Sequence, residues 1–265
     1  MDIHKPKPVH TWREFASEII VIVIGISIAL GAEQVVEGFR QRHQVEQDKV
    51  ILAKELASDL SNGIVRMRTS ACVDARLNEL SVALDRADRS GVLPPMPAPG
   101  RPRNLTFSTA GWDNVVASQS ATHFPRDQLH ALQYVYNIMN YDARLSDDEN
   151  RVWSTIYTMV GPGRRLGAGE AQSLREALVN ARTINLEIAT LAVRLTEQLK
   201  ALNLDFDADE RAKIRKVLTM PMAAVDTRGA CEPVSKVIPP NYGQSPWSQL
   251  LPEGAEAVKT LRTEF

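Results

Sequence analysis

An apolar stretch near the N-terminus constrains this chain more than any other feature of its sequence. The run IIVIVIGISIALGA, Ile19–Ala32, has fourteen residues without a charge. It is apolar on every side of a helix, whereas a helix on the surface of a soluble domain shows a single apolar stripe. With its flanks, Phe15–Val36, it has 22 residues interrupted only by Glu18 and Glu33, and as a helix it would be about 33 Å long. That length crosses the hydrocarbon core of a bilayer, so the sequence predicts a transmembrane helix.

The ends of the stretch also suit a membrane. Trp12 and Phe15 would lie at one interface and Phe39 at the other, as the aromatic belts of membrane proteins do. Thr11 and Glu14 form a capping box that predicts the start of the helix. We therefore expect the transmembrane helix at residues 12–39, with the lipid bilayer as its first partner.

Two alternatives stay open for this stretch. A core helix of a soluble domain can be equally apolar, and a cleavable signal peptide could end at the small residues Ala29–Gly31. Small residues also recur four apart, at Gly25 and Ala29 and at Ser27 and Gly31. This spacing permits helix pairing in lipid, but it equally suits residues that face the lipid.

The prediction of which side of the membrane the domain occupies depends on its two cysteines, Cys72 and Cys231. Both follow the apolar stretch. They could form one disulfide in an oxidising compartment or remain two free thiols in the cytoplasm. Lysines and arginines flank the stretch on both sides, so the positive-inside rule does not decide. Because the leader is short and the cysteine pair suits an oxidising compartment, we expect the N-terminus inside. A bond between the two cysteines would tie the loop-rich C-terminal region to the bundle and would stabilise the domain by constraining the unfolded chain.

The remainder of the sequence predicts an all-α fold, an antiparallel helical bundle of four or five helices attached to the transmembrane helix. Prolines interrupt it in a loop at 91–103 and again towards the C-terminus. The expected organisation is a tail at 1–11, the transmembrane helix at 12–39, the bundle at 40–220 and a loop-rich region at 221–265 with a short helix at Glu253–Arg262.

Apolar residues recur at steps of three and four after the membrane. One very long helix could therefore run from Trp12 to about Arg89, unless Asn62-Gly63 kinks or ends it. Leu129, Leu132, Tyr136 and Met139 predict a helix that opens at Pro125.

Capping boxes, in which a side chain of one residue and an acid three residues later bond each other's backbone, mark two further starts. Ser146 with Glu149 predicts one helix, and Asp207 with Glu210 predicts another that ends near Met220. The longest soluble helix is expected at about 170–202.

No catalytic, cofactor or metal signature is evident. Asp205, Asp207 and Asp209 begin like a calcium loop, but Glu210 stands where glycine is needed, so capping explains them better. The glycine-rich stretch Gly161–Gly169 lacks the lysine of a phosphate loop and is expected to be an interhelical turn. The net charge of -1 does not indicate a nucleic-acid partner. Trp112, Trp153 and Tyr157 are candidates for lining a ligand pocket between helices.

Two stretches resemble a group of uncharacterised proteobacterial membrane proteins. In that group, as in WREF…EIIVIVIGISIALGAEQVVE, a tryptophan and acidic residues precede the apolar helix and Ala-Glu-Gln follows it. The segment STAGWDNVVASQSATHFP is similar to a second recurrent stretch of the group. The resemblance covers about the first half of the chain. It implies a bacterial membrane anchor and a helical domain, and it brings no activity, cofactor or site residue.

These observations favour a structural or protein-interaction module of the bacterial envelope. We expect a single-pass protein of the inner membrane with its domain in the periplasm, and a second copy or another envelope protein as partner. A ligand-sensing domain that acts through a partner subunit is one alternative, and an enzyme of an unrecognised type is another. A deep pocket with converging titratable groups would favour either alternative.

Overall fold

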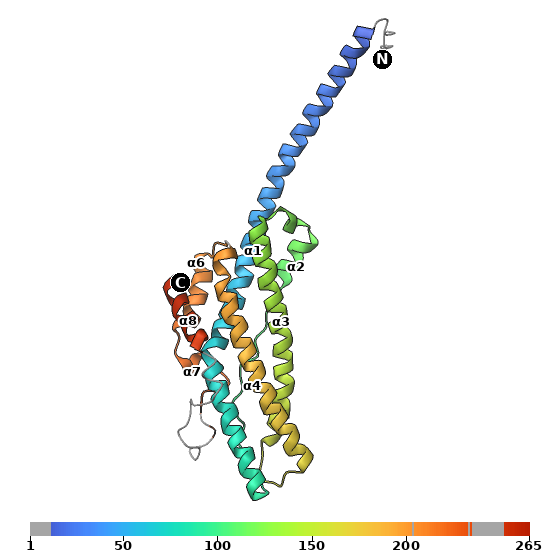
Figure 1. Cartoon of the computed structure of the whole chain (residues 1–265). Helices are drawn as coiled ribbons and strands as arrows, with labels where there is room; N and C mark the ends of the chain where they lie inside the picture. Colours follow the sequence, from blue (N-terminus) through green and yellow to red (C-terminus); the bar gives the residue numbers. More distant parts are fainter. Residues whose placement is uncertain (1–11, 203, 233, 235–251) are drawn as a thin grey trace, which may run out of the picture. The chain divides into compact units, whose positions relative to one another are not determined.

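The computed structural model describes residues 12–202, 204–232, 234 and 252–265. Within these ranges all regular secondary structure is helical, apart from two isolated β-bridges (Figure 1). The all-α fold class is therefore confirmed. The chain divides into two compact units, Met1–Gln47 and Asp48–Phe265. The second unit contains both the bundle and the described part of the C-terminal region.

Helix α1, Trp12–Ser90, is a single helix of 79 residues. It agrees with the longest of the expected alternatives, and the break predicted at Asn62-Gly63 does not occur. Tertiary contacts hold this point of the helix: Gly63 packs against Ala192 and Leu195, and the Asn62 side chain donates to the Thr106 carbonyl oxygen at 2.8 Å. The capping box predicted at Thr11 lies outside the described residues.

Helices α3, Arg126–Ile156, and α4, Ala168–Glu197, complete the framework of the second unit. Pro125 precedes α3 as predicted, but no new helix begins at Ser146. Ser146 and Glu149 are instead buried inside α3, because their side chains face the bundle rather than a helix end. The predicted 170–202 helix is divided into α4 and the short α5, Leu199–Leu202.

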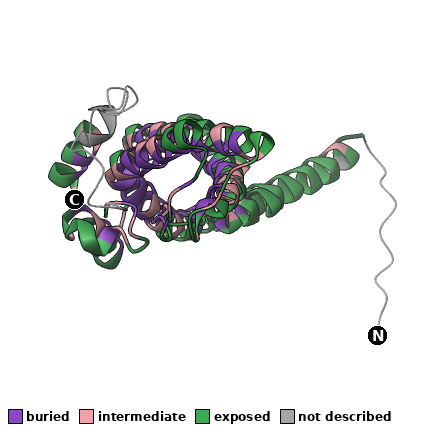
Figure 2. Ribbon diagram, turned by 90° about the horizontal axis from the view of Figure 1, so that it is seen from below, coloured by how far each residue is buried: buried purple, intermediate pink, exposed green. Residues whose placement is uncertain are grey.

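The three long helices enclose the core of the second unit, and their buried residues face its interior (Figure 2). One large cluster combines α1, α3 and α4, for example through Leu80, Trp153 and Leu174, which are at most 1% exposed. The stepwise apolar pattern of each helix accounts for this, since it places one stripe of each helix inward. The domain therefore fills its own core.

Shorter elements lie beside the long helices or connect them (Figure 1). They are α2 (Ala110–Ala117), η1 (Ser120–His123), η2 (Tyr157–Met159), α6 (Ala208–Thr219), α7 (Met222–Val225) and α8 (Pro252–Glu264). The capping box of Asp207 and Glu210 at the start of α6 is confirmed. Helix α8, close to the predicted Glu253–Arg262, packs against α4 and α6.

The proline-rich loop at 91–103 is extended, as its composition predicts. It pairs with the glycine-rich turn after η2: Leu93 N–H donates to the Arg164 carbonyl at 2.8 Å, and Met96 N–H donates to the Gly161 carbonyl at 2.9 Å. These bonds satisfy backbone groups of both loops and hold the proline-rich loop on the bundle.

Candidate functional site

The apolar part of α1 is the most distinctive surface of the first unit. Its most apolar stretch of 18 residues has a mean hydropathy of 2.4, and none of these residues is buried. Among the described residues this is the one helix that is long and apolar enough to cross a membrane. Exposure argues against the core-helix alternative, because a core helix would be covered by other parts of the chain.

The three residues predicted for the membrane interface flank this surface. Trp12 is 78% exposed and Phe39 is 67% exposed. The rings of Trp12 and Phe15 lie against each other with centroids 5.7 Å apart. Large exposed aromatic rings at both ends of an apolar helix are typical of membrane interfaces.

The structure joins Cys72 of α1 to Cys231, which follows α7, with 4.6 Å between their Cα atoms. Asp226 shapes the loop that carries Cys231, because its carboxylate accepts hydrogen bonds from the backbone N–H of Ala230 at 3.0 Å and of Cys231 at 2.6 Å. Arg76 of α1 donates to the Gly229 carbonyl at 3.1 Å. The segment after α7 is therefore fixed to the middle of the second unit by one covalent bond and several polar contacts.

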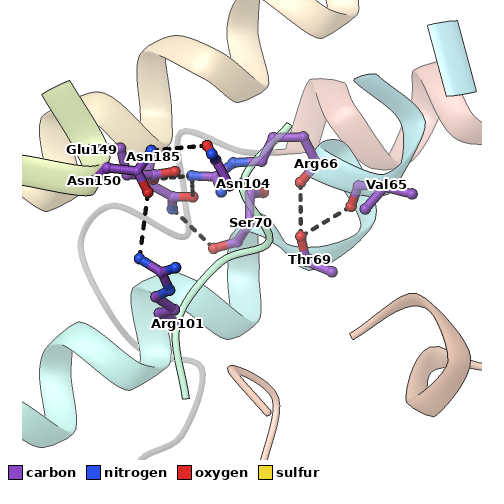
Figure 3. A network of polar contacts seen from close by, with 9 residues as sticks. All are labelled: Val65, Arg66, Thr69, Ser70, Arg101, Asn104, Glu149, Asn150 and Asn185. Atoms are coloured by element: carbon purple, nitrogen blue, oxygen red, sulfur yellow. Dashed lines mark hydrogen bonds and ion pairs between the residues drawn. The ribbon is translucent and has the colours of Figure 1, made fainter. Parts of the chain in front are cut away.

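A network of polar side chains lies in the core where α1, α3 and α4 meet (Figure 3). Arg66 forms an ion pair with Glu149, and the two side chains are 2% and 7% exposed. Arg66 also donates to Asn185 Oδ1 at 3.1 Å, and Asn185 Nδ2 donates to the Ser70 carbonyl at 3.0 Å. Each of the three long helices thus contributes a polar residue to one buried cluster. Because an unpaired charge here would be costly, the network favours one register of the three helices.

Asp142 is a second buried acid of α3, two turns before Glu149 and 1% exposed. Burial raises the pKa of Asp142 to about 8, and the positive charge of Arg66 offsets only part of this increase. Arg66 is bonded to Glu149 and Asn185 instead. Asp142 is therefore mainly protonated at neutral pH, and this neutral acid shares the bundle core with the Arg66–Glu149 ion pair.

Replacing Asp142 with asparagine should stabilise the domain, increasingly so as the pH rises. The pKa of Asp142 is higher in the folded than in the unfolded state, so the free energy of unfolding falls as the pH rises from about 4 to about 8. The neutral amide of asparagine does not titrate and causes no such fall. We expect a gain on the order of 4 kcal/mol at pH 7 and almost none below pH 4. Urea unfolding at several pH values measures it. Asp147→Asn, exposed on the same helix, is the control, and an equal effect of Asp142→Asn at pH 4 and pH 7 would contradict the argument.

Glu55 of α1 is a docking point for the segment around α2. Its carboxylate accepts hydrogen bonds from the Ser108 hydroxyl at 2.7 Å, the Gly111 N–H at 2.8 Å and the Tyr136 hydroxyl at 2.8 Å. One turn along α1, Asp59 accepts from the Ser108 N–H at 3.3 Å, and burial raises its pKa to about 8. The segment at residues 108–125 therefore serves to attach α2 to α1 and α3.

Of the three residues predicted to line one pocket, Trp153 and Tyr157 lie together and Trp112 lies apart from them. Trp112 stacks on Tyr136 with centroids 5.1 Å apart, whereas Trp153 meets Tyr157 at 6.5 Å. Tyr136 and Trp153 are seventeen residues apart on α3, which is about 25 Å along a helix. The prediction of a shared pocket was wrong, because aromatic residues were grouped without knowledge of their separation along one continuous helix.

The remaining candidate sites have structural roles. Asp207 caps α6, and Arg164 of the glycine-rich turn forms an ion pair with Glu170 at the start of α4. Over the residues that the structure describes, no group of three or more His, Cys, Asp or Glu side chains could hold a metal ion. The geometry therefore assigns capping and turn stabilisation to these residues.

The buried network could have been suspected from the sequence. Asp142 lies three residues after Met139 and three before Leu145, on the apolar face of its helix. Asn185 likewise lies between Ala181 and Ile188 at helical steps. A polar residue on an apolar helical face is the available signal, but it does not identify the partner.

No family model, curated protein or solved structure matches this chain. The features of the chain that bear on its function are the exposed apolar helix, the disulfide and the polar interior of the domain.

Proposed function

We propose that the chain is a single-pass protein of the bacterial inner membrane whose periplasmic helical domain is a structural or protein-interaction module. The observation that carries the proposal is the contrast between the two units. The apolar window of α1 has no burial at all, while the helical domain fills its own core with residues of its three long helices. An apolar helix that its own chain does not cover needs another apolar environment, and lipid provides it.

The disulfide supports the periplasmic side. Disulfides persist in oxidising compartments such as the periplasm and are rare in the cytoplasm. With Cys72 and Cys231 on the same side of the apolar helix, a periplasmic domain leaves the short N-terminal tail in the cytoplasm.

The interaction role is supported by what the polar residues do. Arg66 bonds to Glu149 and Asn185, so the network joins side chains of three helices, which gives a rigid framework rather than a reactive centre. Val179 of α4 is 54% exposed and Val116 of α2 is 50% exposed, so the outer face of the domain offers apolar side chains to a partner. Such a partner is a second copy of the chain or another envelope protein.

Site-specific photo-crosslinking in native membranes tests the interaction role. A photoreactive residue at Val179 or Val116 should give a reproducible adduct with one protein, identified by mass spectrometry. The same residue at the buried position Leu178, 2% exposed, is the control and should give none. Absence of any protein adduct, together with a stoichiometric small molecule in the purified protein, would replace this proposal by the ligand-sensing alternative.

A further inference from the structure

A small hollow lies between α1 and the proline-rich loop. Its volume is about 260 Å³, and its walls include Ala83 of α1, Pro94 and Pro97 of the loop, and Val234 near Cys231. The loop is fixed by its two bridges to the glycine-rich turn, and the segment with Val234 is fixed by the disulfide. The hollow is therefore preformed, and its walls are mainly apolar, as in most small-molecule sites.

One buried carboxylate lines this hollow and is only partly satisfied. Glu79 is 3% exposed. Its Oε2 atom lies 3.2 Å from Arg76 Nε and accepts the Val234 N–H at 3.3 Å. Its Oε1 atom is buried and has no hydrogen-bond partner in the part of the chain that the structure describes. Because an unsatisfied buried acceptor costs free energy, a ligand that donates an N–H or O–H group here would be stabilised.

A cation also lines the same hollow. Arg86 is exposed and lines it, and no ion pair of its side chain occurs among the described residues. It follows Glu79 by seven residues on α1, which corresponds to about 10 Å along a helix. The hollow thus presents a buried acceptor, apolar walls and an exposed positive charge.

We propose that this hollow binds a small zwitterion whose ammonium and carboxylate groups lie at opposite ends of an apolar body. The ammonium group donates to Glu79 Oε1, the body packs on the prolines, and the carboxylate pairs with Arg86. An ordinary α-amino acid does not fit this description, because both of its charges lie on one carbon while Glu79 and Arg86 are two helical turns apart. The site is independent of the proposed interaction role.

Calorimetric titration of the full-length protein in detergent, with micelles alone subtracted, tests the proposal with three probes. The simplest zwitterion of this class is 6-aminohexanoate; hexanoate lacks its ammonium group and hexylamine lacks its carboxylate. A charge-assisted bond to a buried carboxylate makes hexanoate about tenfold weaker or worse. The exposed pair with Arg86 makes hexylamine about threefold weaker.

Variants of the lining separate this site from non-specific binding. Arg86→Gln should remove the difference between 6-aminohexanoate and hexylamine, whereas Arg89→Gln, exposed one turn further along α1, should preserve it. Ala83→Leu should fill the hollow and abolish binding of all three probes, with the helical circular dichroism unchanged. Glu79 is left intact, because its loss would leave Arg76 without its buried partner.

Three results would overturn the proposal. They are no binding of 6-aminohexanoate at millimolar concentration, equal binding of hexanoate and 6-aminohexanoate, and persistent binding to a folded Ala83→Leu variant.

Discussion

Replacing Cys72 with serine should lower the free energy of unfolding of the helical domain by about 5 kcal/mol in the chain-entropy model, as an upper figure. The bond joins residues 159 positions apart, so the unfolded chain without it gains the freedom of a very long loop. Urea unfolding in detergent, followed by circular dichroism, measures the loss. Reduced wild type should behave like the variant.

The double variant with Cys72→Ser and Cys231→Ser is the control for this measurement. It should be no less stable than the single variant, and reductant should not change its free energy of unfolding. If oxidised and reduced wild type unfold at the same urea concentration and migrate alike on gels, the bond between Cys72 and Cys231 does not support the domain.

Two arginines in the middle of the apolar helix should prevent its insertion into a membrane. Ile24 and Ile28 lie near the centre of the predicted span and are 53% and 67% exposed. Each arginine at a helix centre costs about 3 kcal/mol on insertion scales, or roughly 6 kcal/mol together. Fractionation of cells that express the Ile24→Arg, Ile28→Arg chain should therefore move it from the membrane pellet to the soluble or aggregated fraction.

The control places one arginine on an exposed apolar residue outside the predicted span. Val179→Arg, on the exposed face of α4, should leave the chain in the membrane pellet. An unchanged distribution of the double-arginine variant would show that lipid does not surround the apolar stretch.

Patterns that depend on nearby residues predicted the fold well. The recurrence of leucine and isoleucine along α1 predicted its end at about Arg89, one residue before Ser90. The pair Asp207 and Glu210 predicted the start of α6, because both partners of that cap lie within one turn of helix. The proline-rich loop was also predicted, since proline excludes the helix by its own geometry.

Predictions that depended on distant residues were less successful. Ser146 and Glu149 have the spacing of a cap, but Glu149 instead pairs with Arg66, 83 residues earlier in the chain. No local pattern contains that partner. The grouping of Trp112 with Trp153 had the same weakness, because it ignored the length of α3 between their positions. The partly satisfied Glu79 likewise becomes visible only when α1, the proline-rich loop and the Cys231 loop are seen together.

Labelling of single introduced cysteines tests most directly whether α1 crosses a membrane with the helical domain on the oxidising side. The two positions are Lys7→Cys in the tail and Asp209→Cys on the exposed side of α6, and the reagent is an impermeant maleimide added to bacterial spheroplasts. We predict that both chains remain in the membrane pellet after an alkaline wash. The cysteine of Asp209→Cys should react in intact spheroplasts, and that of Lys7→Cys should react only after lysis. Release of the uncleaved chain by the wash, or labelling of the tail but not the domain, would contradict this prediction.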